Sequence, residues 1–170
     1  MKKIFLAELR PKNVTKKYVA WMNDYEVVKY TDQKNKKHTI KSTIKFVKRK
    51  KNSKNEFLYG IYFKKSKKQK EHIGNIKLGP INFALNNADI SYFIGNKNYW
   101  GKGYTTIAIS QIIKIAKNKF KLKKIQAVAA NDNFGSVMVL KKNNFKKANL
   151  QEKKILPEQK INIFWYTLVL

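Results

Sequence analysis

The stretch that decides the fold covers residues 92–106 and reads Tyr92-Phe93-Ile94-Gly95-Asn96-Lys97-Asn98-Tyr99-Trp100-Gly101-Lys102-Gly103-Tyr104-Thr105-Thr106. Residues 89–94 are rich in β-branched and aromatic side chains and predict a strand. Residues 107–120 predict a helix, because apolar side chains recur at helical spacing at Ala108, Ile109, Ile112, Ile113, Ala116 and Phe120. The sequence therefore predicts a strand, a glycine turn and a helix start.

Such a turn suits an anionic ligand. The first N–H groups of a helix have no partner within it and lie at its positive end, and glycine lets a ligand approach the backbone closely. Spacing excludes the nucleoside triphosphate loop, which ends in Gly-Lys-Ser/Thr, and the dinucleotide fingerprint Gly-x-Gly-x-x-Gly. The run here is Gly-Lys-Gly-Tyr-Thr-Thr over residues 101–106. We expect a phosphate or diphosphate at this turn.

Two linked motifs resemble those of a known family. In the acyl-CoA loop of the GCN5-related N-acetyltransferases (GNAT), the pattern is Gln/Arg-x-x-Gly-x-Gly/Ala, with Trp100, Gly103 and Thr105 here at its marked positions. The fuller phrase over residues 99–106 is similar to the branch that contains ribosomal-protein N-terminal acetyltransferases (RimJ/RimL-type). Downstream, Asn133-x-x-Ser136 and the run to Phe145 resemble that branch's Asn-x-x-Ser…Leu-x-Lys-x-Gly-Phe.

The resemblance implies a fold and a cosubstrate. The fold is α/β, a single domain over residues 1–170 with a central mixed sheet flanked by helices and one splayed strand pair. The activity is acetyl transfer from acetyl-CoA to a primary amine by direct attack, without a metal. The residues implied in cosubstrate binding are Tyr92, Phe93, Ile94, Gly101, Lys102, Gly103, Tyr104, Thr105, Asn133 and Ser136.

Proton transfer needs a group that protonates the leaving sulfur and a group that takes a proton from the amine. The Tyr that serves as acid in many members is Leu140 here, so Ser136 is our candidate for contact with the CoA sulfur. Asn133 and Ser136 could also simply cap the helix that they open. Asp24 and Glu26 are candidate bases, with Asp89 as a further carboxylate near the expected cleft. Deprotonation of the acceptor through water is an equal alternative.

Composition narrows the class of protein. The 170 residues suffice for one domain, and 43% of them are hydrophobic. With no cysteine and only His38 and His72, disulfides and thiolate or His-rich metal sites are not expected. The first residues lack the apolar length of a signal peptide, and no run approaches the ~18 residues of a membrane span, so we expect a cytoplasmic protein, monomeric or homodimeric.

The formal charge of +28 raises the question of nucleic acid. Of the 38 basic residues only Arg10 and Arg49 are arginine, and the lysines are scattered along the chain. We interpret most of them as solvated surface, so nucleic acid is not an expected partner except through the ribosome. Possible acceptors are a nucleotide-linked amino sugar or a protein N-terminus; a polyamine is disfavoured by its charge. The alternatives are a non-catalytic CoA-binding module or a basic RNA- or ribosome-associated protein.

The rest of the chain predicts the order β-α-α-β-β-β-α-β-α-β-β. Strands are expected over residues 4–9, 57–63, 72–81, 89–94, 124–130, 145–150 and 162–170, and further helices over 14–22, 40–51 and 133–142. Thr39 is the expected N-cap of the helix over 40–51, although Ser42 stands where a full capping box has Glu. Gly79-Pro80 should bend or end its strand. His72 is expected to be solvated.

Overall fold

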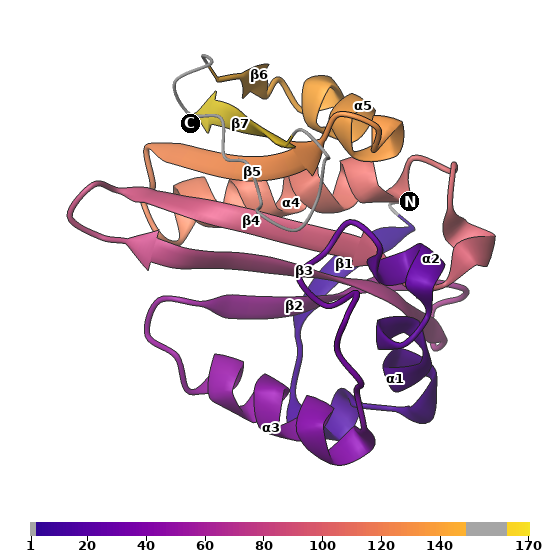
Figure 1. Cartoon of the computed structure of the whole chain (residues 1–170). Helices are drawn as coiled ribbons and strands as arrows, with labels where there is room; N and C mark the ends of the chain where they lie inside the picture. Colours follow the sequence, from indigo (N-terminus) through magenta and orange to yellow (C-terminus); the bar gives the residue numbers. More distant parts are fainter. Residues whose placement is uncertain (1–2, 149–162) are drawn as a thin grey trace.

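A seven-stranded mixed sheet is built by residues 3–148 and 163–170, the part of the chain that the computed structural model describes. Its strand order is β1-β2-β3-β4-β5-β7-β6 (Figure 1). The strands are β1 (Ile4–Glu8), β2 (Phe57–Lys64), β3 (Lys70–Asn82), β4 (Asn87–Ile94), β5 (Lys124–Ala130), β6 (Lys146–Lys147) and β7 (Ile163–Val169). The helices are α1 (Lys16–Met22), α2 (Tyr25–Val28), α3 (Ile40–Lys51), α4 (Tyr104–Asn118) and α5 (Phe134–Lys142), with 3-10 turns η1 (Pro11–Asn13) and η2 (Lys97–Tyr99).

One parallel pair joins the two halves of the sheet. Strands β1 to β4 follow one another as antiparallel neighbours, whereas β4 and β5 pair in parallel and are connected through α4. Parallel neighbours need such a crossover because a tight turn cannot return the chain to the same end of the sheet. Strand β7 then inserts antiparallel between β5 and β6. The predicted mixed sheet flanked by helices is confirmed.

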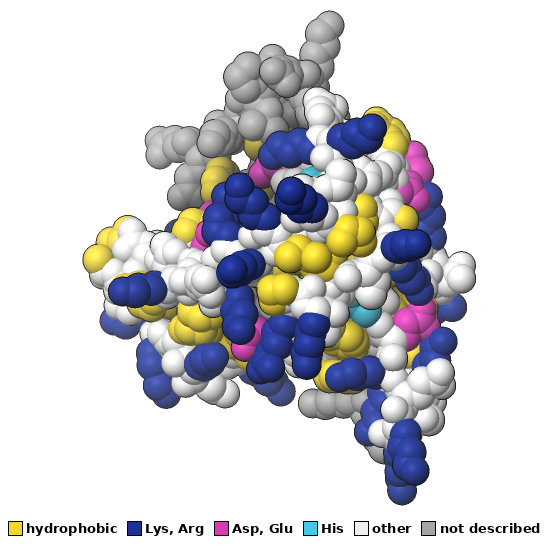
Figure 2. Space-filling view, turned by 90° about the horizontal axis from the view of Figure 1, so that it is seen from below, with side chains coloured by type: hydrophobic (Ala, Val, Ile, Leu, Met, Phe, Trp, Pro, Cys, Tyr) yellow, Lys and Arg dark blue, Asp and Glu magenta, His cyan; other side chains and the backbone are white. Residues whose placement is uncertain are grey.

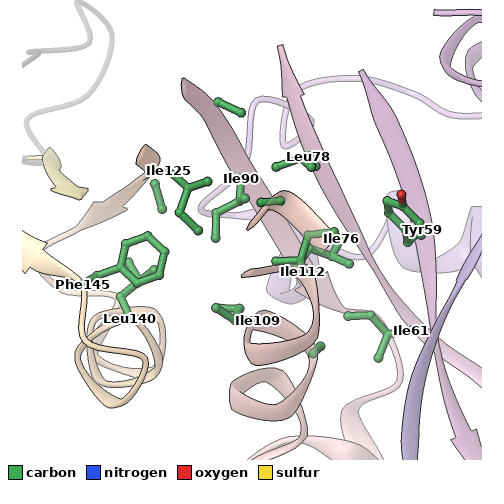
Figure 3. Packing of buried hydrophobic residues seen from close by; sticks show 14 of the residues in the cluster. Tyr59, Ile61, Ile76, Leu78, Ile90, Ile109, Ile112, Ile125, Leu140 and Phe145 are labelled. Carbon is green, nitrogen blue, oxygen red and sulfur yellow. The ribbon is translucent and has the colours of Figure 1, made fainter. Parts of the chain in front are cut away.

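Two cores lie on opposite faces of the sheet, as the period of two along a strand requires. On β2, Tyr59 belongs to the larger cluster and its neighbour Leu58 to the smaller. In the larger cluster, Ile109 and Ile112 of α4 are fully buried against strand residues such as Ile76 (Figure 3). The smaller cluster is formed with α1, α2 and α3, and its members are Leu9, Tyr18, Trp21, Met22, Val27, Val28, Val47 and Leu58.

Local caps explain where two helices begin. Thr15 accepts a hydrogen bond from the N–H of Tyr18 and opens α1. Thr39 caps α3 as predicted, accepting from the N–H of Ser42 at 3.1 Å. The Ser42 hydroxyl accepts from the N–H of Thr39 at 2.9 Å, so a complete capping box forms without Glu.

The structure corrects several predicted elements. The Asn-Asp turn after α1 opens the one-turn helix α2, which the sequence analysis missed. Of the two outcomes predicted for Gly79-Pro80, an end of the strand is wrong, because β3 continues to Asn82; the pairing of β3 with β4 is irregular at this cis peptide and shifts between Leu78 and Ile81. Of the strand expected over 145–150, only Lys146–Lys147 is present among the described residues. Residues 149–150 and residue 162 of the two last predicted strands lie outside the described part.

Candidate active site

The turn after β4 leaves six consecutive backbone N–H groups free. Gly101 and Gly103 have φ angles of +71° and +74°, in the left-handed region that glycine adopts without strain. Helix α4 begins at Tyr104, directly after Gly103, and no side chain caps it. Within residues 3–148 and 163–170, the N–H groups of residues 101–106 have no hydrogen-bond partner. A Cβ atom on either glycine would meet no atom within 4 Å, so the turn is open.

The electrostatics of this turn favour an anion. The positive end of the α4 dipole points into it, and the free N–H groups of its first turn carry this partial positive charge. The exposed ammonium of Lys102 lies 6.0 Å from the centre of the Tyr99 ring and has no carboxylate partner in the described part of the chain. The predicted strand, glycine turn and helix start are confirmed, and the arrangement can bind a diphosphate.

Strands β4 and β5 separate beside this turn. Their parallel pairing covers only Asn87 to Asp89 on β4, opposite Lys124 to Gln126 on β5. Beyond it, β4 keeps β3 on its other side up to Ile94, and β5 keeps β7 up to Ala130. The facing edges of residues 90–94 and 127–130 therefore carry backbone groups that no strand in the described residues pairs. The predicted splayed pair is confirmed, and its open edge can bind an extended amide-containing chain.

An irregularity in β3 lies opposite the point of separation. The register of β3 with β4 shifts between Leu78 and Ile81, next to Asp89, the last β4 residue that pairs with β5. At the far end of β4, the Trp100 indole donates a hydrogen bond of 2.7 Å to the Ile94 carbonyl. Trp100 thus ties the glycine turn to the end of β4.

Tyr92 and Ser136 meet across the splay. The Tyr92 hydroxyl lies 2.8 Å from Ser136 Oγ, and burial raises the pKa of the Tyr92 phenol to about 12. Asn133 caps α5, because its side-chain oxygen accepts from the N–H of Ser136 at 3.2 Å. The capping alternative therefore applies to Asn133, whereas the Ser136 hydroxyl does not cap the helix and is directed to Tyr92. Leu140, at the place of the family's Tyr acid, is fully buried in the core.

The structure does not bring the candidate carboxylates to this pair. Asp24 caps α2 and forms an ion pair of 2.7 Å with Lys97, and the hydrogen bond from Lys97 lowers the pKa of Asp24. Glu26 pairs with Lys29 at 2.9 Å on the exposed side of α2. Asp89 accepts a hydrogen bond of 3.3 Å from Gln126. None of these side chains forms a hydrogen bond with Tyr92 or Ser136.

The prediction that His72 is solvated is wrong. Its ring is half-buried and packs against Tyr18, Trp21 and Tyr62, with centroid distances of 5.7, 5.2 and 5.1 Å. Its Nε2 lies 2.9 Å from both the Gly74 carbonyl and Asn75 Oδ1. Burial lowers the pKa of His72. The sequence analysis missed this because the aromatic partners come from α1 and β2, far away in the chain.

The described residues offer neither a metal-binding cluster nor a membrane-spanning helix. No group of three or more His, Cys, Asp or Glu side chains is arranged to hold a metal ion. No described helix has both the length and the apolar character needed to cross a bilayer.

Solved structures share the fold. Spermidine N-acetyltransferase from Vibrio cholerae, in complex with CoA and spermine, superposes with a TM-score of 0.83 at 16% identity, covering 98% of this chain and 95% of that one. A GNAT-family acetyltransferase from Bacillus anthracis superposes with a TM-score of 0.81 at 19% identity, covering 99% and 95%. The class is therefore the mixed-sheet acetyltransferase fold.

Sequence comparison adds the family. The acetyltransferase (GNAT) domain model matches residues 3–146, and the chain belongs to this family. The probable N-acetyltransferase YjcK of Bacillus subtilis (strain 168) is 33% identical over 111 residues, 65% of this chain. This match spans 57% of the length of that relative.

Proposed function

We propose that the chain is an acetyl-CoA-dependent N-acetyltransferase that acts on a primary amine. The observation that carries the proposal is the run of free N–H groups over residues 101–106, which the Trp100–Ile94 hydrogen bond ties to the end of β4, whose edge toward β5 is unpaired beyond Asp89 among the described residues. A diphosphate next to an extended amide chain is the shape of CoA. Family membership supports the same conclusion.

The residues present fit the cosubstrate. The diphosphate binds the N–H groups of residues 101–105, and Lys102 adds a charge. The pantetheine arm pairs with the backbone of residues 92–94, where that backbone faces the gap to β5. The side-chain oxygen of Asn133 accepts the hydrogen bond that caps α5, so its amide N–H₂ is the group that contacts the arm.

Backbone amides and one hydroxyl pair carry the chemistry. The acceptor amine attacks the thioester carbonyl, the C–S bond breaks, and the sulfur leaves as a thiolate that takes up a proton. N–H groups on the open edge of β4 stabilise the oxyanion, a contribution on the order of 3 kcal/mol for a preorganised donor. In this proposal the Tyr92 phenol, which stays protonated, donates to Ser136, and the Ser136 proton is directed to the sulfur.

Water is the proposed proton acceptor for the amine. The carboxylate of Asp24 is engaged by Lys97 and by the N–H of Glu26, and its lowered pKa makes it a weaker base. Glu26 is engaged by Lys29. Either carboxylate could still orient the water molecule that accepts the proton. Substitution of Asp24 tests this role directly.

The acceptor is proposed to carry negative charge or to be a protein N-terminus. The chain has a formal charge of +28, and lysines are spread over the face seen in Figure 2 with few acidic groups between them. Asp24, Glu26 and Glu71 are each paired with lysine. A nucleotide-linked amino sugar meets this field favourably, whereas a polyamine is repelled by it.

The test is release of CoA thiol from acetyl-CoA across a panel of amines. The panel contains a nucleotide-linked amino sugar, a peptide with a free N-terminus, and spermidine, the last because spermidine acetyltransferases share the fold. Turnover with either of the first two supports the proposal, and a clear preference for spermidine overturns the acceptor assignment. Binding of acetyl-CoA without turnover of any amine would favour a non-catalytic module. RNA retention at high salt without acetyl-CoA binding would favour an RNA-associated protein.

A further inference from the structure

A single carboxylate fastens the segment that leads into the glycine turn. Glu71, near the start of β3, accepts a hydrogen bond of 3.0 Å from Asn96 Nδ2 and one of 2.9 Å from the Tyr99 hydroxyl. Asn96 caps η2 and Tyr99 is its last residue, so Glu71 holds the turn at both ends. The next residues along the chain are Trp100 and Gly101, where the free N–H groups begin.

Lysines balance this carboxylate. Lys17 Nζ lies 2.6 Å from Glu71 Oε1, and Lys65 Nζ lies 2.7 Å from Oε2. The side chain of Glu71 is only 18% exposed. Because its charge is matched locally, Glu71 can lie next to a diphosphate site without repelling the ligand.

Aromatic packing makes the turn a rigid unit. The Tyr99 ring lies 5.1 Å from Phe63 of β2 and 5.8 Å from Tyr104, the first residue of α4. Phe63 and Tyr104 are also 5.4 Å apart. A displacement of Tyr99 would therefore reach the N-terminus of α4 directly. Glu71 can therefore influence the start of α4 through the packed rings of Tyr99 and Tyr104, without touching the ligand itself.

We infer that Glu71 is a positioning residue for the acetyl-CoA site, because it sets the orientation of η2 and through it the free N–H groups of residues 101–106. The inference rests on the proposed function. A merely structural role would lower stability and leave cosubstrate affinity unchanged. Glu71 touches neither substrate in this account and acts only through η2 on the N–H groups that bind acetyl-CoA. Its substitution should therefore change acetyl-CoA binding and leave acceptor binding unchanged.

A matched control exists in the same chain. Glu56 also bridges two lysines, Lys50 and Lys77, and its side chain is 23% exposed, but it joins α3 to β3. In the described part of the chain, no hydrogen bond or ion pair links Lys50, Glu56 or Lys77 to η2 or to the glycine turn. Glu71→Ala and Glu56→Ala should therefore lower thermal stability similarly and differ in cosubstrate affinity. Tyr99→Phe removes one hydroxyl and covers the case in which Glu71→Ala does not fold.

The experiment is calorimetric titration with acetyl-CoA, with hydrogen exchange of the Tyr99 and Trp100 amides measured in parallel. We expect Glu71→Ala and Tyr99→Phe to raise the Kd for acetyl-CoA by roughly tenfold, as loss of a charge-assisted hydrogen bond does. The KM for the acceptor should not change, and exchange at residues 99 and 100 should quicken. An unchanged Kd in both variants, or an equal rise in Glu56→Ala, would overturn the inference about Glu71 and leave the proposed function standing. Failure of the unsubstituted protein to bind acetyl-CoA would overturn the proposed function as well.

Discussion

The hydroxyls of Tyr92 and Ser136 lie 2.8 Å apart, although the two residues are 44 positions apart in the chain and belong to β4 and α5. The contact spans the splay, and it places a hydroxyl pair at the end of the open β4 edge. Because burial keeps Tyr92 protonated, its phenol can donate to Ser136 Oγ, which is the direction that the proposed function uses.

Ser136→Ala should lower kcat by about 100-fold, since it removes the proposed proton donor to sulfur. Tyr92→Phe should lower kcat by about 10-fold, and the double variant should resemble Ser136→Ala, because both changes interrupt one relay. CoA thiol release measures all three. Ser91→Ala, an exposed neighbour on β4, is the control. A Ser136→Ala enzyme within about twofold of the unsubstituted protein would remove Ser136 from the chemistry.

Gly103→Ala should weaken acetyl-CoA binding and lower the free energy of unfolding by about 1–2 kcal/mol, because a Cβ strains a backbone with φ of +74°. The added methyl meets no protein atom, so the loss of stability reports backbone strain, whereas the loss of affinity also reports the closer approach that glycine allows the ligand. Calorimetry and urea unfolding measure the two quantities.

Gly135→Ala is the matched control for this substitution. Gly135 lies inside α5 without a positive φ, and alanine there should be neutral or stabilising by up to about 1 kcal/mol. Equal losses of stability at positions 103 and 135 would argue against the backbone strain assigned to Gly103; the comparison is confined to stability because Gly135 lies between Asn133 and Ser136.

Asp24→Asn should leave kcat and its pH dependence unchanged within about twofold, because water is the proposed base. Asparagine caps a helix as well as aspartate does, and an exposed ion pair such as that with Lys97 contributes less than about 1 kcal/mol. Rate against pH is the measurement, with Glu26→Gln alongside. A loss of about 100-fold together with a flattened acidic limb would instead identify Asp24 as the base.

Glu71 should make stability depend on pH in the acidic range. Partial burial would raise its pKa, but hydrogen bonds from Lys17, Lys65 and Tyr99 outweigh this and lower the pKa from 4.5 to about 2. A lowered carboxyl pKa stabilises the fold above the unfolded value and loses that contribution as pH falls toward the folded value. Glu71→Gln should therefore be less stable than the unsubstituted protein above about pH 4.5, and the difference should shrink toward pH 2. Urea unfolding as a function of pH tests this, and a pH-independent difference would contradict it.

Both histidines should titrate below the ordinary value. Burial lowers the pKa of His72, and burial together with the charge of Lys36 lowers that of His38. Because the unfolded chain takes up protons first, acidification below about pH 6.5 should destabilise the fold. NMR titration of the two ring signals is the measurement, and a midpoint for His72 at or above 6.5 would contradict the packing described here.

Local sequence was sufficient for most elements. The helix over residues 40–51 and the strand over 124–130 match α3 and β5 residue for residue, because each has a clear period and a clear stop. The glycine turn was predictable for a similar reason: left-handed glycines before an apolar helix are a local signal. The helix it opens begins earlier than the apolar pattern, at Tyr104, because its first turn is only partly buried and carries two threonines, which do not contribute to an apolar period.

Long-range contacts could not be predicted in the same way. The sequence analysis treated Tyr92 as a backbone contributor, and no local pattern shows that its hydroxyl meets Ser136. Glu71 and His72 were also missed, since their partners come from α1, β2 and η2. The acidic residues chosen by proximity in sequence turned out to be held by lysines, an outcome favoured by the large excess of basic side chains.

The central claim is that the free backbone at residues 101–106 binds a diphosphate while the open edge of β4 binds the thiol-bearing arm. Calorimetric titration of the intact chain with acetyl-CoA, compared with S-acetylpantetheine, which lacks the diphosphate, tests it most directly. The account predicts one acetyl-CoA site per chain and binding of S-acetylpantetheine that is weaker by at least about 100-fold, the scale of several charge-assisted hydrogen bonds. No binding of acetyl-CoA, or equal affinity for the two compounds, would contradict it.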